Sequence, residues 1–234
     1  EEEARIARLV HASGAPVPAV GEVVEVNGRV GLLYERVVGV SMLSAWLAQP
    51  WRLTHYALRL AELQAGLHAL PAPAGLPSQK ESLAADLRAA PALPPALRDE
   101  LVAQLEALPA GGQLCHGDFH PDNVLLTERG PVILDWVDAR AGNPLGDVAR
   151  TSVLMGFSQP PPGVRLDWKV RLLRYWFHKT WLAHYRRLRP CAPAELSRWR
   201  LVVAGARLSE TVPEADALLA FVGRVSYPPF SDGG

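Results

Sequence analysis

Apolar side chains at helical spacing open the chain. Ile6, Leu9 and Val10 fall on one face of a helix over residues 3–13, and Gly14 is of a type that commonly ends a helix. The sequence therefore predicts that the first segment is an amphipathic helix.

Two β-type segments follow this helix. Val20–Val26 and Val30–Tyr34 are rich in β-branched residues, which fit the pleated surface of a sheet. Residues 27–28 are Asn-Gly, and both positions tolerate the positive φ that a tight hairpin turn requires. Pro16 and Pro18 favour an extended backbone before the first strand. The sequence therefore predicts a β-hairpin after the helix.

Helical periodicity dominates the chain after Gly39. Predicted helices cover residues 51–70, 81–90, 95–108, 145–156, 165–188, 193–209 and 213–222. Two short strands, 124–126 and 132–134, surround a predicted turn. The pattern predicts an α+β fold with a small N-terminal α/β lobe at residues 1–38. The rest, 39–234, is predicted to be a larger, mainly helical lobe that contains one β-hairpin.

Composition limits the classes of partner. The chain has 234 residues, 49% of them hydrophobic, which is enough to bury a core. Its formal net charge of +0 gives no reason to expect nucleic acid or an anionic membrane as a partner. Cys115 and Cys191 lack metal-ligand spacing and are expected to be free thiols. No apolar run is long enough to span a bilayer and no signal peptide is visible, so a cytoplasmic location is expected. Oligomeric state is not predicted.

Three oxygen-bearing side chains are spaced for phosphoryl transfer. Asp118 lies in a loop before a strand, where its carboxylate can orient an acceptor hydroxyl and take its proton. Asn123 follows five residues later, at the spacing of a kinase catalytic loop. Asp135 ends the next strand, and a hairpin would bring it to the same end as Asn123. Because amide and carboxylate oxygens are good ligands for Mg²⁺, Asp118 is the candidate catalytic residue, and Asn123 and Asp135 are the candidate metal ligands.

The surrounding motifs resemble those of the aminoglycoside phosphotransferase family, a branch of the protein-kinase-like fold that includes choline-kinase-like and thiamine-kinase-like enzymes. The motif H-G-D-x-H-x-x-N is matched at His116, Gly117, Asp118, His120 and Asn123. A second motif places its metal-binding aspartate at Asp135, followed by Trp136, Asp138 and Ala139. A third, G-x-P-x-x-D-x-A, is matched at Gly142, Pro144, Asp147 and Ala149.

This resemblance implies a small-molecule kinase that moves the γ-phosphoryl group of ATP, or of GTP, to an alcohol with the help of Mg²⁺. It implies that Asp118 is the catalytic base and that Asn123 and Asp135 bind the metal and the nucleotide. It also implies that Asp147 holds the catalytic loop through hydrogen bonds to the backbone, with His116 packed beneath that loop.

The resemblance also implies residues at the nucleotide. Residues 34–37 resemble the hinge between the two lobes of a kinase, so Glu35, Arg36 and Val37 are expected near the adenine. Glu3 is the first candidate for the helix glutamate that pairs with a phosphate-binding lysine, with Glu1 and Glu2 as rivals.

A phosphate-binding lysine is not found where the fold would need it. A kinase-like site requires a glycine-rich strand turn and a lysine before the glutamate helix. Lys80, Lys169 and Lys179 all follow the predicted hinge. The chain also opens at Glu1, inside a predicted helix, which reads as the middle of a longer polypeptide. We therefore expect the chain as given to be weakly active or inactive in nucleotide transfer, and a longer product to supply these parts.

Two alternative functions remain open. A degenerate kinase fold could serve as a binding module, although a dead site has no physical need for the three oxygen ligands. A metal-dependent hydrolase is the other alternative, because several metal-ligand types cluster in the sequence. These residues are His116, Asp118, His120, Asp122 and Asp135.

The charge of the C-terminal region bears on the acceptor. Between Arg165 and Arg207 the sequence has eleven lysines and arginines but only Asp167 and Glu195 as acids. The family binds its acceptor in this region, so a neutral or anionic acceptor is expected rather than a polyamine antibiotic, with a solvated basic face as the alternative. Aromatic residues in the region are expected to pack in the core rather than to bind a ring or a quaternary cation. These are Trp168, Tyr175, Trp176, Trp181, Tyr185 and Trp199.

Overall fold

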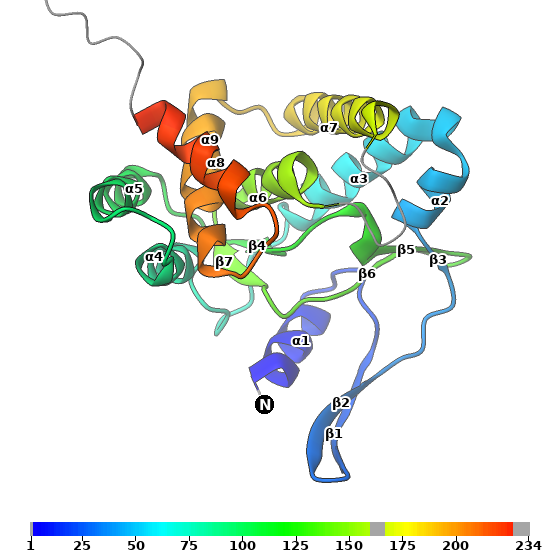
Figure 1. Ribbon diagram of the computed structural model, residues 1–234. Helices are drawn as coiled ribbons and strands as arrows, with labels where there is room; N and C mark the ends of the chain where they lie inside the picture. Colours follow the sequence, from blue (N-terminus) through cyan, green and yellow to red (C-terminus); the bar gives the residue numbers. More distant parts are fainter. Residues whose placement is uncertain (1, 160–166, 227–234) are drawn as a thin grey trace, which may run out of the picture.

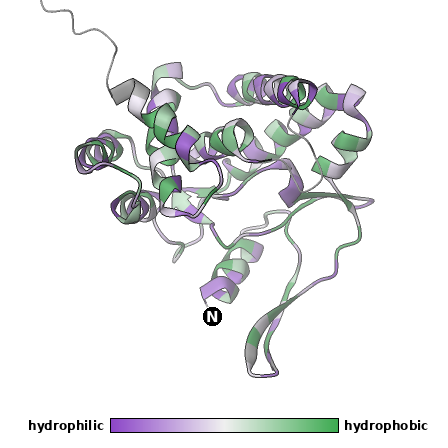
Figure 2. Ribbon diagram, viewed as in Figure 1, coloured by the Kyte–Doolittle hydropathy of each residue, from purple (hydrophilic) through white to green (hydrophobic). Residues whose placement is uncertain are grey.

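The computed structural model describes residues 2–159 and 167–226 of the chain. The N-terminal part consists of helix α1 (Glu2–Ala12) and the strands β1 (Val20–Val26) and β2 (Arg29–Tyr34). Figure 1 shows the β1–β2 hairpin projecting away from the body of helices. Figure 2 shows that hydrophobic residues lie along this projecting hairpin, where Val30 and Leu33 are exposed.

The hairpin follows from its turn residues. Asn27 and Gly28 have φ values of 53° and 72°, the left-handed conformation that a tight two-residue turn needs. The strands on either side are antiparallel, with Val24 opposite Gly31. The predicted order of helix, strand, turn and strand is therefore confirmed.

Helices make up most of the remaining chain. They are α2 (Met42–Ala48), α3 (Leu53–Leu67), α4 (Gln79–Ala89), α5 (Pro95–Ala107), α6 (Pro144–Phe157), α7 (Trp168–Leu188), α8 (Pro193–Ala206) and α9 (Ala215–Ser226). In the described part of the chain, three short 3₁₀ turns accompany them: η1 (Pro50–Arg52), η2 (Pro121–Asn123) and η3 (Arg207–Ser209). None of the helices in the described part of the chain is both long and apolar enough to cross a membrane.

Four predicted helices start two or three residues from the predicted position; α4 starts at Gln79 rather than residue 81, and α9 at Ala215 rather than residue 213. The helix predicted over 51–70 begins at Leu53, because Pro50 opens the 3₁₀ turn η1 and leaves Trp51 exposed. The helix predicted from residue 165 begins at Trp168, and residues 165–166 lie outside the described part of the chain. The periodicity also does not predict α2, a short helix whose first turn is capped by the hydroxyl of Ser41.

The helical lobe contains more strands than the single predicted hairpin. That hairpin is present as β5 (Val124–Thr127) and β6 (Gly130–Ile133), and β3 (Val40–Ser41) adds a third strand beside β5. A separate antiparallel pair joins β4 (Gln113–Cys115) to β7 (Arg140–Gly142). The prediction of one hairpin was thus incomplete, because strands of two or three residues are too short to show a period of two.

One hydrophobic core extends through the helical lobe and reaches α1. The contacts are densest between α3 and α7 and between α6 and α8, and Ile6 and Val10 of α1 belong to the same buried cluster. The backbone N–H of Ile133 in β6 also donates to the carbonyl of Pro16 at 2.7 Å. These contacts fix α1 against the hairpin that carries the candidate site, so residues 2–16 pack against the larger lobe.

Candidate active site

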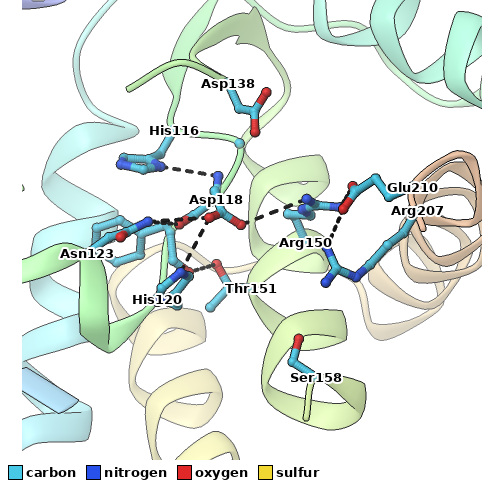
Figure 3. A network of polar contacts seen from close by, with 12 residues as sticks. His116, Asp118, His120, Asn123, Asp138, Arg150, Thr151, Ser158, Arg207 and Glu210 are labelled. Carbon is cyan, nitrogen blue, oxygen red and sulfur yellow. Dashed lines mark hydrogen bonds and ion pairs between the residues drawn. The ribbon is translucent and has the colours of Figure 1, made fainter. Parts of the chain in front are cut away.

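Asp118 lies at the centre of a network of polar contacts (Figure 3). It follows β4 in a loop where Gly117 has a φ of 83°, and any side chain at Gly117 would strike the carbonyl of Asp138. Asp118 Oδ2 lies 3.4 Å from His120 Nε2, and Oδ1 lies 3.8 Å from Arg150 Nη2. Burial opposes ionisation, but His120 and Arg150 outweigh it and lower the pKa of Asp118. The site therefore holds a partly exposed carboxylate in its charged form.

Asn123 is anchored to the same loop. Its amide nitrogen donates to the carbonyl of Asp118 at 2.9 Å and faces the carboxylate Oδ2 at 3.4 Å. Both contacts use the NH₂ group, so the amide oxygen of Asn123 stays free to accept or to ligate. An amide oxygen is a suitable ligand for a hard cation such as Mg²⁺.

Asp135 lies at the same end of the β5–β6 hairpin as Asn123. Val124 pairs with Ile133, and the N–H of Leu134 donates to the carbonyl of Asn123 at 2.8 Å. Asp135 is exposed and has a φ of 58°, which is unusual for a residue other than glycine. Its carboxylate forms no hydrogen bond or ion pair with any residue that the structure describes. The chemistry of Asn123 and Asp135 therefore fits an oxygen-liganded divalent ion.

His116 is fully buried beneath the loop. Its Nδ1 accepts the backbone N–H of Asp118 at 3.2 Å, so Nε2 carries the proton and donates to the carbonyl of Leu134 at 2.9 Å. The ring packs on Trp136 with 4.5 Å between ring centroids. Burial lowers the pKa of His116, which keeps the ring neutral. His116 therefore joins the loop of Asp118 to the strand end that carries Asp135.

Asp147 holds the candidate catalytic loop, residues 116–120 between β4 and η2, through a backbone hydrogen bond. Its Oδ1 accepts the backbone N–H of Gly117 at 2.6 Å, and its Oδ2 accepts from Gln64 Nε2 and faces His68 Nε2, each at 3.0 Å. Burial would raise the pKa of Asp147, but His68 and the Gly117 N–H lower it to about 2. His68 Nδ1 in turn lies 2.6 Å from the hydroxyl of Tyr185. A fully buried network thus connects α3, α6 and α7 to the loop.

Sequence reasoning did not identify Gln64 and His68 as part of the site. A signal for them exists, because Gln64 on the buried face of α3 and His68 at the C-cap of that helix are two polar residues four positions apart. Such a pair is buried only when it finds a partner. The sequence alone did not show that the partner was Asp147.

Arg150 is a second residue near Asp118 that the sequence did not identify. It lies on α6, three residues after Asp147, so both side chains project from one face of the helix. Its Nη1 donates to Glu210 Oε1 at 2.9 Å, and Arg207 donates to the other oxygen of Glu210 at 3.0 Å. Figure 3 shows these charged groups in a row beside Asp118. The spacing from Asp147 is the signal that could have pointed to Arg150.

A cleft of about 340 Å³ lies on the Asp135 side of the site. Of the residues expected at a nucleotide, Glu3, Glu35, Val37 and Asp135 line it. Arg36 is exposed and is not among the lining residues, nor is Asn123. Tyr34 also lines the cleft, and its hydroxyl lies 3.4 Å from Glu3 Oε1. Glu1 and Glu2 are the rivals of Glu3 for the glutamate that pairs with a phosphate-binding lysine. Glu1 lies outside the described residues.

Glu35 links the end of β2 to the β5–β6 hairpin through side-chain hydrogen bonds. Its carboxylate accepts from Arg129 Nη2 at 2.6 Å and from the backbone N–H of Ala19 at 3.2 Å. Hydrogen bonding to Arg129 and to Ala19 lowers the pKa of Glu35. Arg129 lies in the turn of the β5–β6 hairpin, so Glu35 connects the end of β2 to that hairpin.

A smaller cavity of about 100 Å³ lies on the Arg150 side of Asp118. Its walls come from the catalytic loop, α4, α6, α8 and η3. The lining includes four acids and three arginines: Asp86, Asp138, Asp147, Glu210, Arg140, Arg150 and Arg207. Among the described cations of the basic segment 165–207, Arg207 is the one that lines it. The excess of basic residues in that segment therefore does not make the cavity wall basic.

The other basic and aromatic residues of the segment divide between core and surface. Arg174 donates to carbonyls at the end of α6, including Met155 at 2.7 Å, and Arg200 donates to Ser152 at 3.0 Å. Trp181, Tyr185 and Trp199 are buried as expected. The expectation of core packing is wrong for Trp168, Tyr175 and Trp176, which are exposed on α7.

The contacts do not favour a histidine–aspartate metal cluster. His116 uses both ring nitrogens in the protein, and His120 uses Nδ1 to accept the N–H of Asp122. In the part of the chain that the structure describes, no three His, Cys, Asp or Glu side chains gather to hold a metal ion. Asn123 and Asp135 form a different, oxygen-only donor set.

Comparison with known proteins places the fold. A family model described as the phosphotransferase enzyme family matches residues 1–191. No curated protein sequence matches the chain. An aminoglycoside-3'-phosphotransferase of type VIII has a similar structure, with a TM-score of 0.60 and 24% identity over 88% of this chain and 79% of that one. The protein-kinase-like α+β fold expected from the sequence is confirmed.

Two further solved structures are similar. A choline/ethanolamine kinase family protein from Mesorhizobium loti has a TM-score of 0.61 and 19% identity over 97% of this chain and 79% of that one. A thermostable mutant of the aminoglycoside phosphotransferase APH(4)-Ia, solved with ADP and hygromycin B, has a TM-score of 0.63 and 17% identity over 96% of this chain and 80% of that one. At these identities the likeness concerns the fold.

Proposed function

The chain belongs to the phosphotransferase enzyme family, and on this premise we propose that it is a small-molecule kinase. The reaction is transfer of the γ-phosphoryl group of ATP, or of GTP, to a hydroxyl of a small acceptor. The acceptor oxygen attacks the γ-phosphorus, the bond from that phosphorus to the bridging oxygen breaks, and the nucleoside diphosphate leaves. The hydroxyl proton passes to Asp118.

The position of Asp118 is the observation that carries this proposal. Its Oδ2 lies 3.4 Å from both Asn123 Nδ2 and His120 Nε2. Its Oδ1 lies 3.8 Å from Nη2 of Arg150, a residue that lines the smaller cavity, although Asp118 itself is not among the lining residues. A hydroxyl bound at Oδ1 would have its proton directed at a charged carboxylate, which is the geometry that general-base orientation needs. The lowered pKa of Asp118 supports this role, because the group is ionised before the acceptor binds.

Asn123 and Asp135 are the residues that we propose to hold Mg²⁺. Asn123 offers its free amide oxygen, and Asp135 offers a carboxylate without a partner among the described residues. When bound, the ion would neutralise charge on the phosphates. His116 then has a positioning role, because it links the Asp118 loop to Leu134, the residue before Asp135.

We propose the cleft beside Asp135 as the nucleotide site. Mutants of APH(4)-Ia have been solved in ternary complexes with ADP or AMP-PNP, which supports a nucleotide as the phosphoryl donor here. In this assignment residues 1–38 contribute a partial nucleotide lobe and residues 39–234 the catalytic and acceptor lobe. Glu3, Glu35 and Val37 line the cleft, so the side chains of these residues, and the backbone of Arg36, are proposed near the nucleotide.

We propose a small, neutral or anionic alcohol as the acceptor. The cavity beside Arg150 is about 100 Å³, less than a third of the cleft beside Asp135, which favours a compact acceptor. Among the described cations of the basic segment 165–207, only Arg207 lines the cavity. The charge that the acceptor can carry therefore depends on the charged residues of the cavity wall and not on that segment as a whole.

Substitution at Asp118 tests the proposed function. In an N-terminally longer chain that supplies the glycine-rich turn and the phosphate-binding lysine, Asp118→Ala is expected to abolish Mg²⁺-dependent ATP turnover on a panel of small alcohols. The unfolding midpoint should change little, because the side chain is only partly buried. Asp122→Asn is the matched control: it removes an exposed carboxylate four residues away and should leave turnover intact. An Asp118→Ala protein that still phosphorylates the acceptor would refute the assignment. Loss of turnover in Asp122→Asn would instead favour the hydrolase-like ligand set.

A further inference from the structure

Three arginines line the cavity beside Asp118, and two of them are engaged by the protein. Arg207 donates Nε and Nη2 to Glu214 and Nη1 to Glu210, at 2.9–3.1 Å. Arg140 donates Nε to the hydroxyl of Ser82 at 2.9 Å, and its Nη1 donates to two backbone carbonyls. These two guanidinium groups are therefore held as part of the cavity wall.

Arg150 is the third arginine, and most of its donors are unused. Nη1 donates to Glu210, whereas Nη2 lies 3.8 Å from Asp118 Oδ1, too far for a hydrogen bond. Nε is buried and has no hydrogen-bond partner. A guanidinium carries five N–H groups, and a buried donor without a partner needs an explanation. The side chain is 17% exposed, so its charge is poorly screened by solvent.

We propose that Arg150 binds an anionic group of the acceptor, a carboxylate or a phosphate, close to the hydroxyl that is phosphorylated. The inference rests on the proposed function, and it makes Arg150 a specificity-determining residue for that reaction. The planar fork of a guanidinium matches both anions, because either can accept two parallel N–H bonds.

The position of Arg150 assigns this anion to the acceptor rather than to the nucleotide. The two carboxylate oxygens of Asp118 face different groups: Oδ2 faces Asn123, and Oδ1 faces Arg150. Arg150 also lines the smaller cavity, whereas Asp135 lines the cleft proposed for the nucleotide. An acceptor whose hydroxyl reaches Oδ1 would therefore bring its neighbouring substituent to Arg150.

Glu210 can release Arg150 without being left unpaired. Arg207 donates to the other oxygen of Glu210 at 3.0 Å, so that carboxylate keeps a cationic partner when an anion takes over the donors of Arg150. Asp86 lines the same cavity and forms no hydrogen bond or ion pair with a described residue. A cationic acceptor that binds Asp86 is thus the competing outcome, and it predicts effects of the opposite sign.

Binding of orthophosphate, used as the probe anion, tests the proposal without any turnover. We would titrate ¹⁵N-labelled protein saturated with Mg²⁺ and AMP-PNP, and follow the amide signals around Asp118 by NMR. This analogue fills the γ-phosphoryl position as well as the rest of the nucleotide site, so the remaining phosphate binding reports the Arg150 side. Arg150→Gln should weaken phosphate binding by about tenfold or more, and Arg150→Lys by less, because lysine keeps the charge but loses the fork. Arg187→Gln, which removes an exposed arginine outside the cavity lining, is the matched control and should bind phosphate as the unmodified protein does.

Each result decides the proposal. Equal phosphate affinity in the unmodified protein and in Arg150→Gln would overturn it, and so would phosphate binding that AMP-PNP abolishes. Asp86→Asn gives a second measurement if Arg150→Gln fails to fold: it should tighten phosphate binding if the cavity takes an anion. Weaker phosphate binding in Asp86→Asn would also contradict the proposal.

Turnover distinguishes failure of this inference from failure of the proposed function. With matched three-carbon alcohols as acceptors, glycerate should have a lower KM than glycerol or 3-amino-1,2-propanediol, and Arg150→Gln should raise the KM for glycerate more than it lowers kcat. A fall in kcat alone would place Arg150 at the transferred phosphoryl group and overturn the acceptor assignment. A preference for the amine would overturn the proposed anion but leave the kinase function standing.

Discussion

Asp135 has a backbone conformation that opposes its side chain. Its φ of 58° costs a residue with a Cβ about 1–2 kcal/mol relative to glycine, although aspartate is among the more tolerant types. Nothing in the described contacts compensates, because the carboxylate has no partner in that part of the chain. A ligand-binding role for Asp135 would explain both its strained backbone and its unpartnered carboxylate at the end of the hairpin.

Substitutions at Asp135 are expected to separate stability from activity. The free energy of unfolding of Asp135→Gly should exceed that of Asp135→Ala by about 1 kcal/mol, because glycine adopts positive φ without a steric penalty. Asp135→Gly should therefore unfold at a higher urea concentration. Both variants should lose nearly all turnover, since both remove the proposed metal ligand. Urea unfolding and a Mg²⁺-dependent kinase assay provide the two measurements. An active Asp135→Gly protein would show that the carboxylate is not needed.

Asp147 is expected to make stability depend on pH in the acid range. The folded protein lowers the pKa of Asp147 from 3.8 to about 2, so the unfolded chain binds the proton more readily. The stabilisation, about 2 kcal/mol, is fully present above pH 4–5 and is lost as the pH falls through about 2. The free energy of unfolding of the unmodified protein should therefore approach that of Asp147→Asn as the pH is lowered from 5 towards 2. A difference that stays constant over this range would contradict the assignment.

At the scale of elements, α6 organises the site through one of its faces. Asp147, Arg150 and Thr151 are spaced by three and four residues, so they project together towards the catalytic loop. Thr151 donates its hydroxyl to the carbonyl of Phe119 at 2.8 Å, next to Asp118. The loop is thus held at Gly117 and at Phe119 by a single rigid helix. This arrangement explains how a short loop can keep Asp118 in a fixed position.

The packing of α8 against α4 and α5 shapes the smaller cavity. Gly205 of α8 lies so close to these helices that an added Cβ would be 2.5 Å from Leu101 Cδ1 and 3.0 Å from Leu87 Cδ2. α4 and α8 both contribute walls to the cavity beside Asp118, through residues such as Asp86 and Val203. The separation of these helices therefore matters for the acceptor site.

Enlarging Gly205 should affect the acceptor more than the nucleotide. Gly205→Val is expected to destabilise the protein by about 1–3 kcal/mol through overpacking, and Gly205→Ala by less, because Leu101 can move. The KM for the acceptor should rise, while the affinity for ADP should change little because the nucleotide cleft is formed by other elements. Thermal unfolding, steady-state kinetics and ADP titration measure the three effects. A larger loss of ADP affinity than of acceptor affinity would contradict this division of the site.

At the scale of the whole molecule, the sequence predicts those elements that depend on neighbouring residues alone. The β1–β2 hairpin follows from Asn27 and Gly28, and the long helices follow from their apolar periodicity. The β4–β7 pair could not be predicted, because each strand has three residues and its partner lies 25 or more residues away. The contacts of His68 and Arg150 were missed for a similar reason. They depend on which helices pack together, and only the folded chain determines that.

The cleft that we propose for the nucleotide is assembled from segments far apart in the chain. Glu3 and Val17 precede the hairpin, Tyr34 ends β2, and Leu125 and Asp135 belong to the β5–β6 region. A ligand that binds this cleft contacts all of these segments only in the folded state. Binding must therefore stabilise the whole protein by linkage, in proportion to the logarithm of ligand concentration over Kd.

Mg²⁺-ADP is accordingly expected to raise the unfolding temperature. At a concentration about 100 times Kd the stabilisation is about 2.7 kcal/mol, which corresponds to roughly 5–10 °C for a chain of this length. Removing Mg²⁺ with EDTA should reduce the shift, and Asp135→Ala should remove its Mg²⁺-dependent part, whereas Asp122→Asn should retain the full shift. Differential scanning fluorimetry measures all four conditions. A shift of equal size with and without Mg²⁺ would mean that the nucleotide binds without the ion, and that Asp135 and Asn123 serve another purpose.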